Sequence, residues 1–311
     1  MRPIDGETVR LLTAKCASAG TCRIYYDLAP SGSVHQGILR TLLYAQQLSV
    51  ELRDAGIRCE LTIRINDRAP VRGGPSADER HADIGRRWRD CSDPHSGRSW
   101  PELFREEIEA ILAALNFKAR VLDASAIYTD AAFQDFAWSI TARHRFFPGM
   151  DGVVHPVSAE TGRRILWSDV FWSDDRLMAR DPDQPSPVFV SRDFGGGLIG
   201  YRLETALMWR HFGFDLDLHA ANQSFNYRGS VQISQTLFGS HAVSPRLGIV
   251  LGEDGKMMSK SRCNFVPVVD TLRDDGAFDA LAAGLSAQKW WRDLRRDWHT
   301  AGQAAATSSR K

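Results

Sequence analysis

In the N-terminal part of the chain the hydrophobic positions change their period twice, which predicts a strand, a helix and a second strand. Residues 21–29 (TCRIYYDLA) form a short apolar run, rich in β-branched and aromatic side chains, that ends before a proline. Across residues 38–55 apolar side chains recur at helical spacing, and Gly56 follows where a C-cap glycine is expected. Residues 57–67 (IRCELTIRIND) alternate as a strand does. This order is the repeating unit of a parallel sheet with right-handed crossovers.

The same alternation continues along the chain and predicts the fold class. Residues 69–100 are polar and rich in Gly and Pro, as in an excursion from a sheet. Further helices are predicted at residues 100–117, 133–147, 201–213, 230–239 and 277–302, and further strands at 118–125, 187–197, 214–222 and 246–256. We therefore expect an α/β fold with a doubly wound, Rossmann-like parallel sheet. Residues 1–264 would form the catalytic domain with an insertion at roughly 131–190, and residues 265–311 a short helical C-terminal segment and tail.

Composition narrows the class of protein without indicating a function. The chain has 311 residues, of which 43% are hydrophobic and 25% charged, so it can bury a substantial core. Its formal net charge of +1 argues against a nucleic-acid coat protein and against an acidic tail. No apolar run approaches the roughly 20 residues of a membrane span, and the N-terminus has no signal-peptide pattern. We expect a cytoplasmic protein without a membrane partner.

The cysteines predict neither a disulfide framework nor a metal site. There are five of them, Cys16, Cys22, Cys59, Cys91 and Cys263, and no two form a C-x-x-C pair. An odd, scattered set fits a reducing compartment and offers no zinc framework. From these spacings we expect buried or unreactive thiols and no metal ligands.

The turn between the first strand and its helix has the composition of a nucleotide-binding loop. This turn, APSGSVHQG, contains Pro30, Ser31, Gly32, His35 and Gly37. In open parallel sheets, ligands bind beyond the carboxyl ends of the strands, where this turn is expected. Small residues let a nucleotide approach the backbone, the helix N-terminus attracts phosphate, and the histidine adds a donor. A lone histidine in such a turn is more often structural, so this loop is a weak signal by itself.

A second candidate loop follows a later apolar strand, at residues 252–264 (GEDGKMMSKSRCN). Its residues of interest are Lys256, Met258, Ser259, Lys260 and Ser261. A lysine flanked by hydroxyl groups suits the triphosphate of ATP, because it neutralises the charge that develops on pyrophosphate when the α-phosphate is attacked. Most stretches of Lys, Ser and Gly are solvated surface turns, so this loop is also weak on its own.

Together the two loops resemble a known pair of signatures. PSGSVHQG near the start and MMSKS near the end are similar to the HIGH and KMSKS motifs of class I aminoacyl-tRNA synthetases. Residues 29–72, 93–128 and 203–239 resemble in particular the class I lysyl-tRNA synthetases, with gaps between them. The resemblance implies that an amino acid reacts with ATP, in the presence of Mg²⁺, to give an aminoacyl adenylate. In that family the aminoacyl group then passes to a tRNA hydroxyl.

The resemblance also implies roles for individual residues. The catalytic residues would be His35, Lys256 and Lys260, which act on the phosphates of ATP. The ATP site would comprise Pro30, Ser31, Gly32, His35, Gly37, Asn222, Met258, Ser259, Lys260 and Ser261, with Asn222 near the ribose. The amino acid would lie against Asp67, Glu204, Thr205, Gln223 and Tyr227. Glu204 would hold a cationic side chain, since a buried carboxylate needs a charge partner; an ordinary exposed glutamate is the alternative.

Several positions depart from the family pattern. Ile38 replaces the family's Asn or His, and Met257 replaces its first lysine. The family's D-W-P becomes residues 204–206 (ETA), and its G-K-D-H becomes residues 220–223 (AANQ). The loss of an aromatic wall and a histidine predicts a different amino acid, larger or modified. The residues that follow Asn264 are too few for the family's helical anticodon-binding domain, and its cysteine-rich zinc insert is missing.

Three functions stay open at this point. The favoured one is an ATP-dependent ligase that transfers the activated amino acid to a small-molecule or amino acid acceptor in a biosynthetic pathway. Charging of a tRNA with lysine or a related amino acid is nearly as well supported. The third is an inactive paralogue that senses a ligand, which the changes at Ile38, Asn222 and Gln223 favour and the presence of His35 and Lys260 opposes. A nucleotidyltransferase of similar fold is less well supported. Such an enzyme would lack the stretches in the middle of the chain that resemble class I lysyl-tRNA synthetases.

Overall fold

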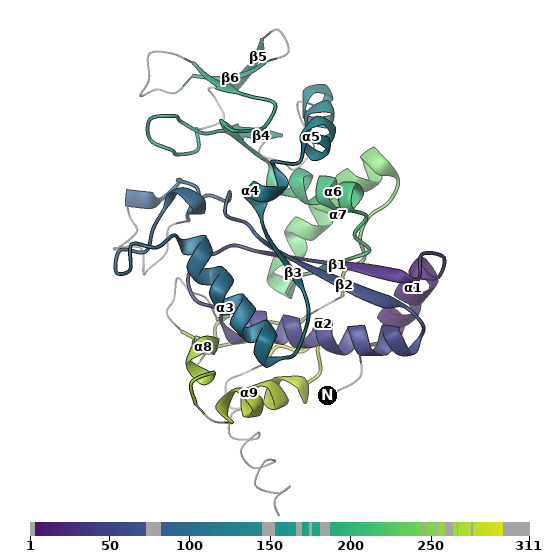
Figure 1. Ribbon diagram of the computed structural model, residues 1–311. Coiled ribbons are helices and arrows are strands. Elements are labelled where there is room, and N and C mark those ends of the chain that lie inside the picture. Colours follow the sequence, from purple (N-terminus) through teal and green to yellow (C-terminus); the bar gives the residue numbers. More distant parts are fainter. Residues whose placement is uncertain are drawn as a thin grey trace, which may run out of the picture.

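A four-stranded parallel sheet forms the centre of the fold. The computed structural model describes residues 4–72, 82–144, 153–165, 170–173, 176–180, 187–245, 247–252, 254–258, 264–265, 267–274 and 276–294. The strands are β1 (Thr21–Leu28), β2 (Arg58–Ile65), β3 (Arg120–Asp123) and β9 (Leu216–Leu218), in the order β3-β2-β1-β9. All three pairings are parallel, and β1 pairs with β2 over its whole length. The predicted α/β class with a parallel, Rossmann-like sheet is confirmed (Figure 1).

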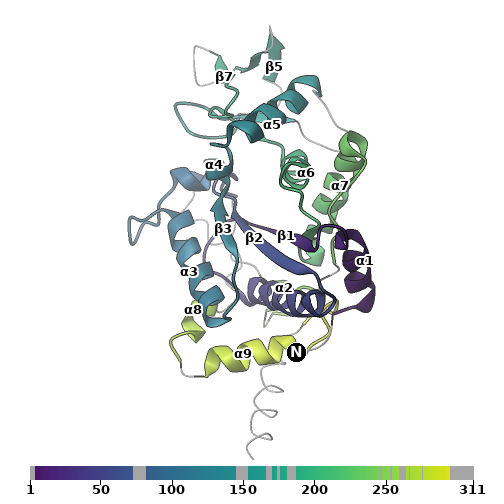
Figure 2. The same ribbon diagram turned by 45° about the vertical axis from the view of Figure 1, so that its right-hand side comes forward.

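Helices α2 (Gln36–Asp54), α3 (Trp100–Ala114) and α9 (Ala277–Ser286) lie along one face of this sheet (Figures 1 and 2). Their apolar side chains join those of the strands in one core, which includes Ile24, Leu39 and Ile63. Local sequence signals determine where the helices begin and end. Ser99 and Glu102 form a capping box at the start of α3, which satisfies backbone N–H groups that the first turn leaves unpaired.

Helices α6 (Tyr201–Phe212) and α7 (Ser224–Phe238) pack against each other and lie on the opposite side of the sheet (Figure 1). Gly213, with φ 65°, ends α6 in the left-handed conformation, as the pattern predicted. The buried face of α6 forms a second core that includes Leu203, Leu207 and Tyr25 of β1. The two sides of the sheet therefore belong to two separate hydrophobic clusters.

Smaller elements lie between β3 and α6 in the sequence and above the parallel sheet in Figure 1. They are α4 (Ala124–Ile127), α5 (Ala131–Arg143), β4 (Val154–Pro156), β5 (Val170–Ser173), β6 (Arg176–Ala179), β7 (Val188–Val190) and β8 (Gly197–Ile199). β4 pairs with β8, and β5, β6 and β7 form a three-stranded sheet, with every pairing antiparallel. These antiparallel pieces are separate from the parallel sheet that carries the candidate loops.

The C-terminal part of the described chain is less regular than predicted. α8 (Val268–Thr271) and α9 are helical, but α9 ends at Ser286 and residues 287–294 are not helical. The carbonyl groups of residues 289, 290 and 292 accept hydrogen bonds from Arg40, so they do not take part in a helix. The strand predicted at residues 246–256 is reduced to isolated bridges, such as Val250 with Leu294.

An N-terminal helix, α1 (Gly6–Cys16), was not predicted from the pattern. Leu12 and Cys16 are its buried residues, so its apolar signal is weak. Asp5 caps it by accepting a hydrogen bond from the N–H of Glu7. None of the described helices is long and apolar enough to span a membrane.

Candidate active site

A cavity of about 510 Å³ lies at the carboxyl ends of β1 and β9. Its walls come from the end of β1 and the turn after it, the first turn of α2, residues 217–226, and residues 248–258. Strands β2 and β3 lie to one side of β1 and the later strand β9 to the other, so the strand order reverses at this point. Open α/β sheets bind ligands at such switch points, and the volume is typical of a small-molecule site.

His35 lines this cavity and is the N-cap residue of α2. Its Nδ1 accepts a hydrogen bond from the backbone N–H of Gly37 at 3.1 Å, so the neutral imidazole carries its proton on Nε2. A Cβ atom at residue 37 would lie 2.8 Å from Cε1 of His35. Glycine at this position therefore allows the histidine ring to cap the helix. The result is an N–H donor at the positive end of a helix dipole.

The turn before α2 keeps its backbone accessible from the cavity side. Gly32 has φ 126°, a conformation that side-chain-bearing residues rarely adopt. Ser31 lines the cavity, and its N–H donates to the carbonyl oxygen of Ala29 at 2.8 Å. The first turn of α2 contains no acidic residue, so the helix N-terminus keeps its partial positive charge there. A carboxylate lies just before the helix, where Glu107 of α3 accepts a hydrogen bond from the N–H of Val34 at 2.6 Å. These features suit an anionic group such as phosphate.

The buried guanidinium of Arg40, on α2, holds another part of the cavity wall. It donates to the carbonyl oxygens of Gly248 at 2.9 Å and Arg292 at 2.8 Å. A Cβ atom at Gly248 would lie 2.1 Å from the Arg292 oxygen, so only glycine permits this approach. Burial lowers the pKa of Arg40 to about 10, which leaves it charged at neutral pH. The segment that Arg40 holds leads directly into Met257 and Met258, which line the cavity.

The two candidate loops lie next to each other. The N–H of Val268 donates to the carbonyl oxygen of Val34 at 2.8 Å, immediately before His35. The ring of Phe265 meets the ring of His35 edge-on, with 5.8 Å between centroids. Ser259, Lys260 and Ser261 lie outside the described residues. The segments that flank them in sequence, at Met258 and Phe265, thus reach the cavity and the His35 ring respectively.

Two buried carboxylates face the same cavity from the strand ends. Burial raises the pKa of Asp27, although Arg64 opposes this effect. Burial and then the charge of Asp27 raise the pKa of Asp217 well above its usual range. Trp209 donates its Nε1–H to Asp217 at 3.0 Å. Carboxylates in such an environment favour a cationic ligand group, because the ion pair offsets their desolvation.

Arg64, on β2 beside Asp27, supplies positive charge beneath the cavity. Its Nη1 lies 3.2 Å from Oδ1 of Asp27, and its Nη2 lies 2.7 Å from Oε1 of Glu204. Tyr128 donates its hydroxyl to the same Glu204 oxygen at 2.5 Å. This arginine is thus shared by two carboxylates, with Asp217 nearby in addition. When all three acids are ionised, the group has an excess of negative charge.

Polar side chains that follow β9 form the rim of the cavity. Asn222 and Gln223 belong to a short 3₁₀ helix (Ala221–Gln223), and the amide of Asn226 donates to the Gln223 side chain at 3.0 Å. His219 lies 2.9 Å from the hydroxyl of Ser244, measured from Nδ1. Burial lowers the pKa of His219 to about 4, so the imidazole is neutral at pH 7. The rim thus presents amides and a neutral imidazole rather than charges.

The structure brings part of the predicted site together in this cavity. The predicted residues in its wall are Ser31, His35, Gly37, Asn222, Gln223 and Met258. Those described but not among the lining residues are Pro30, Gly32, Asp67, Glu204, Thr205, Tyr227 and Lys256. Lys256 is exposed in the turn before Met257, where its backbone N–H donates to Asp254.

The residues expected to hold the amino acid have internal partners. Glu204 is buried as expected, but its cationic partner is Arg64 of the protein itself. Asp67 accepts a hydrogen bond from the N–H of Ser125, at the start of α4, at 2.8 Å. Thr205 and Tyr227 donate their hydroxyl groups to the backbone carbonyls of residues 201 and 242. These contacts fix the surroundings of the cavity and do not extend into it.

Sequence reasoning missed Asp27, Asp217, Tyr201, Trp88 and His219, which also line the cavity. Asp27 and Asp217 carried a usable signal. Each is an acidic residue near the end of a buried parallel strand, where a charge is costly unless it has a function. Trp88 carried no such signal, because it reaches the cavity from the polar excursion after β2.

A comparison with protein families finds a match in the N-terminal part of the chain. The family described as "tRNA synthetases class I (K)" matches residues 6–145, so this part of the chain is similar to that family. The matched part includes β1, the His35 turn, α2 and the strands up to β3. No curated protein matches the chain.

Two structures of tyrosyl-tRNA synthetases are among the solved structures that match this chain. The enzyme from Archaeoglobus fulgidus, in complex with L-tyrosine, is 17% identical, with a TM-score of 0.45 over 84% of this chain and 64% of that one. The enzyme from Aeropyrum pernix is 15% identical, with a TM-score of 0.45 over 83% of this chain and 62% of that one. This chain thus spans less than two thirds of the length of either enzyme.

Proposed function

We propose that this protein activates an amino acid with ATP, forming an aminoacyl adenylate and pyrophosphate. The observation that carries the proposal is the composition of one cavity at the switch point of the sheet. It combines the positive N-terminus of α2, capped by His35, with two buried carboxylates, Asp27 and Asp217. An anionic triphosphate and a cationic ammonium group need these two opposite environments side by side.

The phosphates of ATP would lie at the start of α2. There the Nε2–H of His35 would offer a donor, and the first turn of α2 contains no acidic residue that would repel the anion. Lys260 would approach from the neighbouring loop and neutralise the pyrophosphate as it leaves. Mg²⁺ would enter with the nucleotide, bridging the phosphates with few protein ligands. The amide of Asn222 on the rim would bind the ribose.

The amino acid would lie with its ammonium group toward Asp27 and Asp217. Because Asp27 and Asp217 line the cavity and Glu204 does not, these two acids would take over the role that sequence reasoning gave to Glu204. A cationic side chain, as in lysine or a related amino acid, would favour the ionised form of these two acids, whose pKa values burial raises. Tyr201 and Trp88 would supply aromatic walls around the aliphatic part of that side chain.

The chemistry then requires positioning and charge neutralisation and no protein nucleophile. A carboxylate oxygen of the amino acid attacks the α-phosphorus of ATP in line. A new O–P bond forms, the bond to the bridging oxygen breaks, and pyrophosphate leaves with both electrons of that bond. In the second step a nucleophile of the acceptor attacks the carbonyl carbon, and AMP leaves.

For the acceptor we infer a small molecule or amino acid rather than a tRNA. Proteins that hold a nucleic acid neutralise several phosphates with Lys and Arg, whereas this chain has a formal net charge of +1. The acceptor is tested separately, by incubating the enzyme with labelled amino acid and either total tRNA or small amines. Label recovered on tRNA would overturn this part of the proposal and leave the first step intact.

The experiment that tests the first step is amino-acid-dependent exchange of pyrophosphate into ATP, on protein freed of RNA. We expect exchange with a cationic amino acid. His35→Ala should lower kcat/KM by about a hundredfold, since one phosphate donor contributes about 3 kcal/mol to the transition state. His95→Ala, a histidine outside the cavity wall, is the matched control and should leave the rate unchanged. Binding of ATP without exchange for any amino acid would replace the proposal with a ligand-sensing function.

A further inference from the structure

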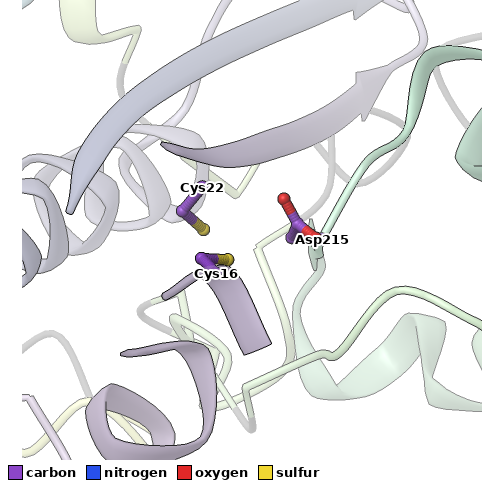
Figure 3. Close-up of side chains that lie close together, drawn as sticks. All are labelled: Cys16, Cys22 and Asp215. Atoms are coloured by element: carbon purple, nitrogen blue, oxygen red, sulfur yellow. The ribbon is translucent and has the colours of Figure 1, made fainter. Parts of the chain in front are cut away.

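Two thiols and a carboxylate converge at the end of the sheet opposite the candidate active site. Cys16 ends α1, Cys22 lies near the start of β1, and Asp215 directly precedes β9. Figure 3 shows their side chains pointing toward one another, and the two sulfur atoms and a carboxylate oxygen all lie within 4.8 Å of one another. Both cysteines are fully buried, and Asp215 is partly buried. The candidate active site uses none of these residues.

A third sulfur atom lies next to this cluster. Cys59, on β2, is the register partner of Cys22, and the two thiols are within hydrogen-bond distance of each other. The thiol of Cys16 likewise contacts both Cys22 and Asp215. All three cysteines are free thiols. The spacing of the cysteines predicted no zinc framework, because these ligands come from segments that only the fold brings together.

The donor set is that of a borderline-soft metal ion. Zinc prefers thiolate and carboxylate ligands in a tetrahedral arrangement, and a fully protein-ligated site is structural. With Zn–S bonds of about 2.3 Å, ligand atoms around zinc lie about 3.8 Å apart, so these three groups need shifts of only about 1 Å to enclose an ion. Hard ions such as Mg²⁺ would not choose sulfur ligands.

We propose that Cys16, Cys22 and Asp215 bind one Zn²⁺ ion, with Cys59 as the fourth ligand. Binding releases the thiol protons of the three cysteines to solvent and forms three Zn–S bonds and one Zn–O bond. Two charges of the resulting anionic site are neutralised by the ion. Lys15, whose Nζ lies 3.6 Å from Asp215, adds positive charge beside it.

The ion would tie three elements together at the amino end of the sheet. α1 has two buried residues of its own, Leu12 and Cys16, and Val9 packs beside them on the core. Nζ of Lys15 also donates to the carbonyl oxygens of Asp215 and His241. A metal that joins the end of α1 to β1 and to the residue before β9 would fix this helix on the sheet edge. Because folding forms the site, metal binding adds directly to stability.

The test is direct metal binding to the reduced, metal-stripped full chain. We expect one equivalent of Zn²⁺, measured against a chromophoric chelator, and thiolate-to-metal absorption when Co²⁺ is used instead. Zn²⁺ should also raise Tm. Cys16→Ser, Cys22→Ser and Asp215→Asn should each weaken Zn²⁺ binding by more than about tenfold, since even outer-shell partners of a metal have effects of that size. Cys91→Ser, a buried cysteine in a separate cluster, is the matched control and should bind Zn²⁺ normally.

Two results would overturn the proposal. One is wild-type protein that binds no stoichiometric Zn²⁺ and shows no Tm shift with the ion. The other is equal binding by the wild type and a folded Cys16→Ser variant, with folding checked by circular dichroism. If the serine variants do not fold, the cobalt spectrum of the wild type alone decides, because Co²⁺ bound without thiolates lacks the charge-transfer absorption. The test does not use pyrophosphate exchange. A failure of the zinc proposal can therefore be distinguished from a failure of the proposed function.

Discussion

The two faces of the parallel sheet are built from alternate residues of the same strands; both pack on apolar cores, but the second also buries a network of charged side chains. On the face toward α2, β1 presents Ile24, Tyr26 and Leu28, which pack into a continuous apolar core. On the other face the same strand presents Tyr25 and Asp27, and Asp27 pairs with the fully buried Arg64. One face is what a stable α/β protein requires. The other holds charges that a fold alone has no reason to bury.

This difference indicates where stability and function lie. Apolar burial on the α2 face gains roughly 25 cal/mol per Å² removed from water and needs no exact partner. Buried ion pairs are different, because replacing them with well-packed apolar residues is often neutral or stabilising. The polar face also contributes Asp217 to the cavity, next to Asp27. We infer that these charges are present for the ligand, and three predictions test whether the faces differ in this way.

The largest effect is expected from Arg64→Met. This change leaves Asp27 and Glu204 buried without their common cation, which should lower the free energy of unfolding by about 3–5 kcal/mol. Most domains have only about 5–15 kcal/mol in total, so the variant should be close to unfolding at room temperature. Urea unfolding followed by circular dichroism measures the loss.

Three controls sharpen this result. Arg58→Met removes the exposed pair with Glu60 and should cost about 1 kcal/mol or less. Arg64→Met combined with Glu204→Gln should regain part of the loss, because one unpaired charge is removed. Leu39→Ala, on the apolar face, should cost about 3 kcal/mol and leave the KM for the amino acid unchanged. A loss of less than about 1 kcal/mol for Arg64→Met would show that water reaches the network and that its charges are not buried.

The two faces also differ in how far the sequence could predict them. The strands, α2 and the glycine that follows α2 could be predicted from the hydrophobic period, since the large apolar side chains of α2 pack inward, with the exception of Val50. His35 and Gly37 could be singled out because a Gly/Ser turn after a buried strand has few structural explanations. By contrast, the partner of Glu204 could not be predicted. Arg64 stands in an alternating strand pattern that fits an exposed cation equally well, and only the register of β1 and β2 buries it.

Non-local packing also determines the conformation of the C-terminal residues. The pattern of residues 277–302 favours one long helix, but Arg40 of α2 draws the carbonyl groups of residues 289–292 into a different arrangement. Trp290 is buried there against Tyr44 of α2. A hydrogen-bond donor more than 200 residues away in sequence therefore overrides local helix propensity, which is only a weak preference.

A smaller effect is expected from His219, on the polar side of the site. Its folded pKa of about 4 lies below the usual value of 6.5, so the folded state binds fewer protons than the unfolded state between these pH values. Stability should therefore fall as the pH is lowered from about 7 to 5, by about 2 kcal/mol from this residue. His219→Gln should remove that part of the slope when Tm or urea midpoints are measured across this range.

The exposed His95 supplies the matched control for that experiment, since His95→Gln should keep the slope of the wild type. An unchanged slope in His219→Gln would mean that the imidazole has the same pKa in the folded and unfolded states, so that burial does not disfavour its charged form. A steeper slope in the variant would mean that the imidazole is protonated and paired in the folded state, and the cavity rim would then favour an anionic ligand at this point.

The smallest effect on stability, and the only gain, is expected from Asp217→Asn. Burial and then Asp27 raise the pKa of Asp217, so its ionised form is disfavoured in the folded state. The stability that such a group contributes is present below its unfolded pKa and is lost as the pH rises through the folded pKa. Asparagine avoids this loss and still accepts from Trp209, so the variant should gain about 1 kcal/mol at pH 7 and nothing at pH values below about 4.

The same substitution should weaken use of the amino acid, because the ammonium group loses one of its two carboxylates. The exposed Asp54→Asn is the matched control and should change neither quantity. A gain in stability together with a rise in KM would mean that Asp217 is kept for the ligand at a cost to the fold. A loss of stability at pH 7 would instead mean that the carboxylate stabilises the fold. The two faces would then differ in composition, but both would serve stability rather than ligand binding.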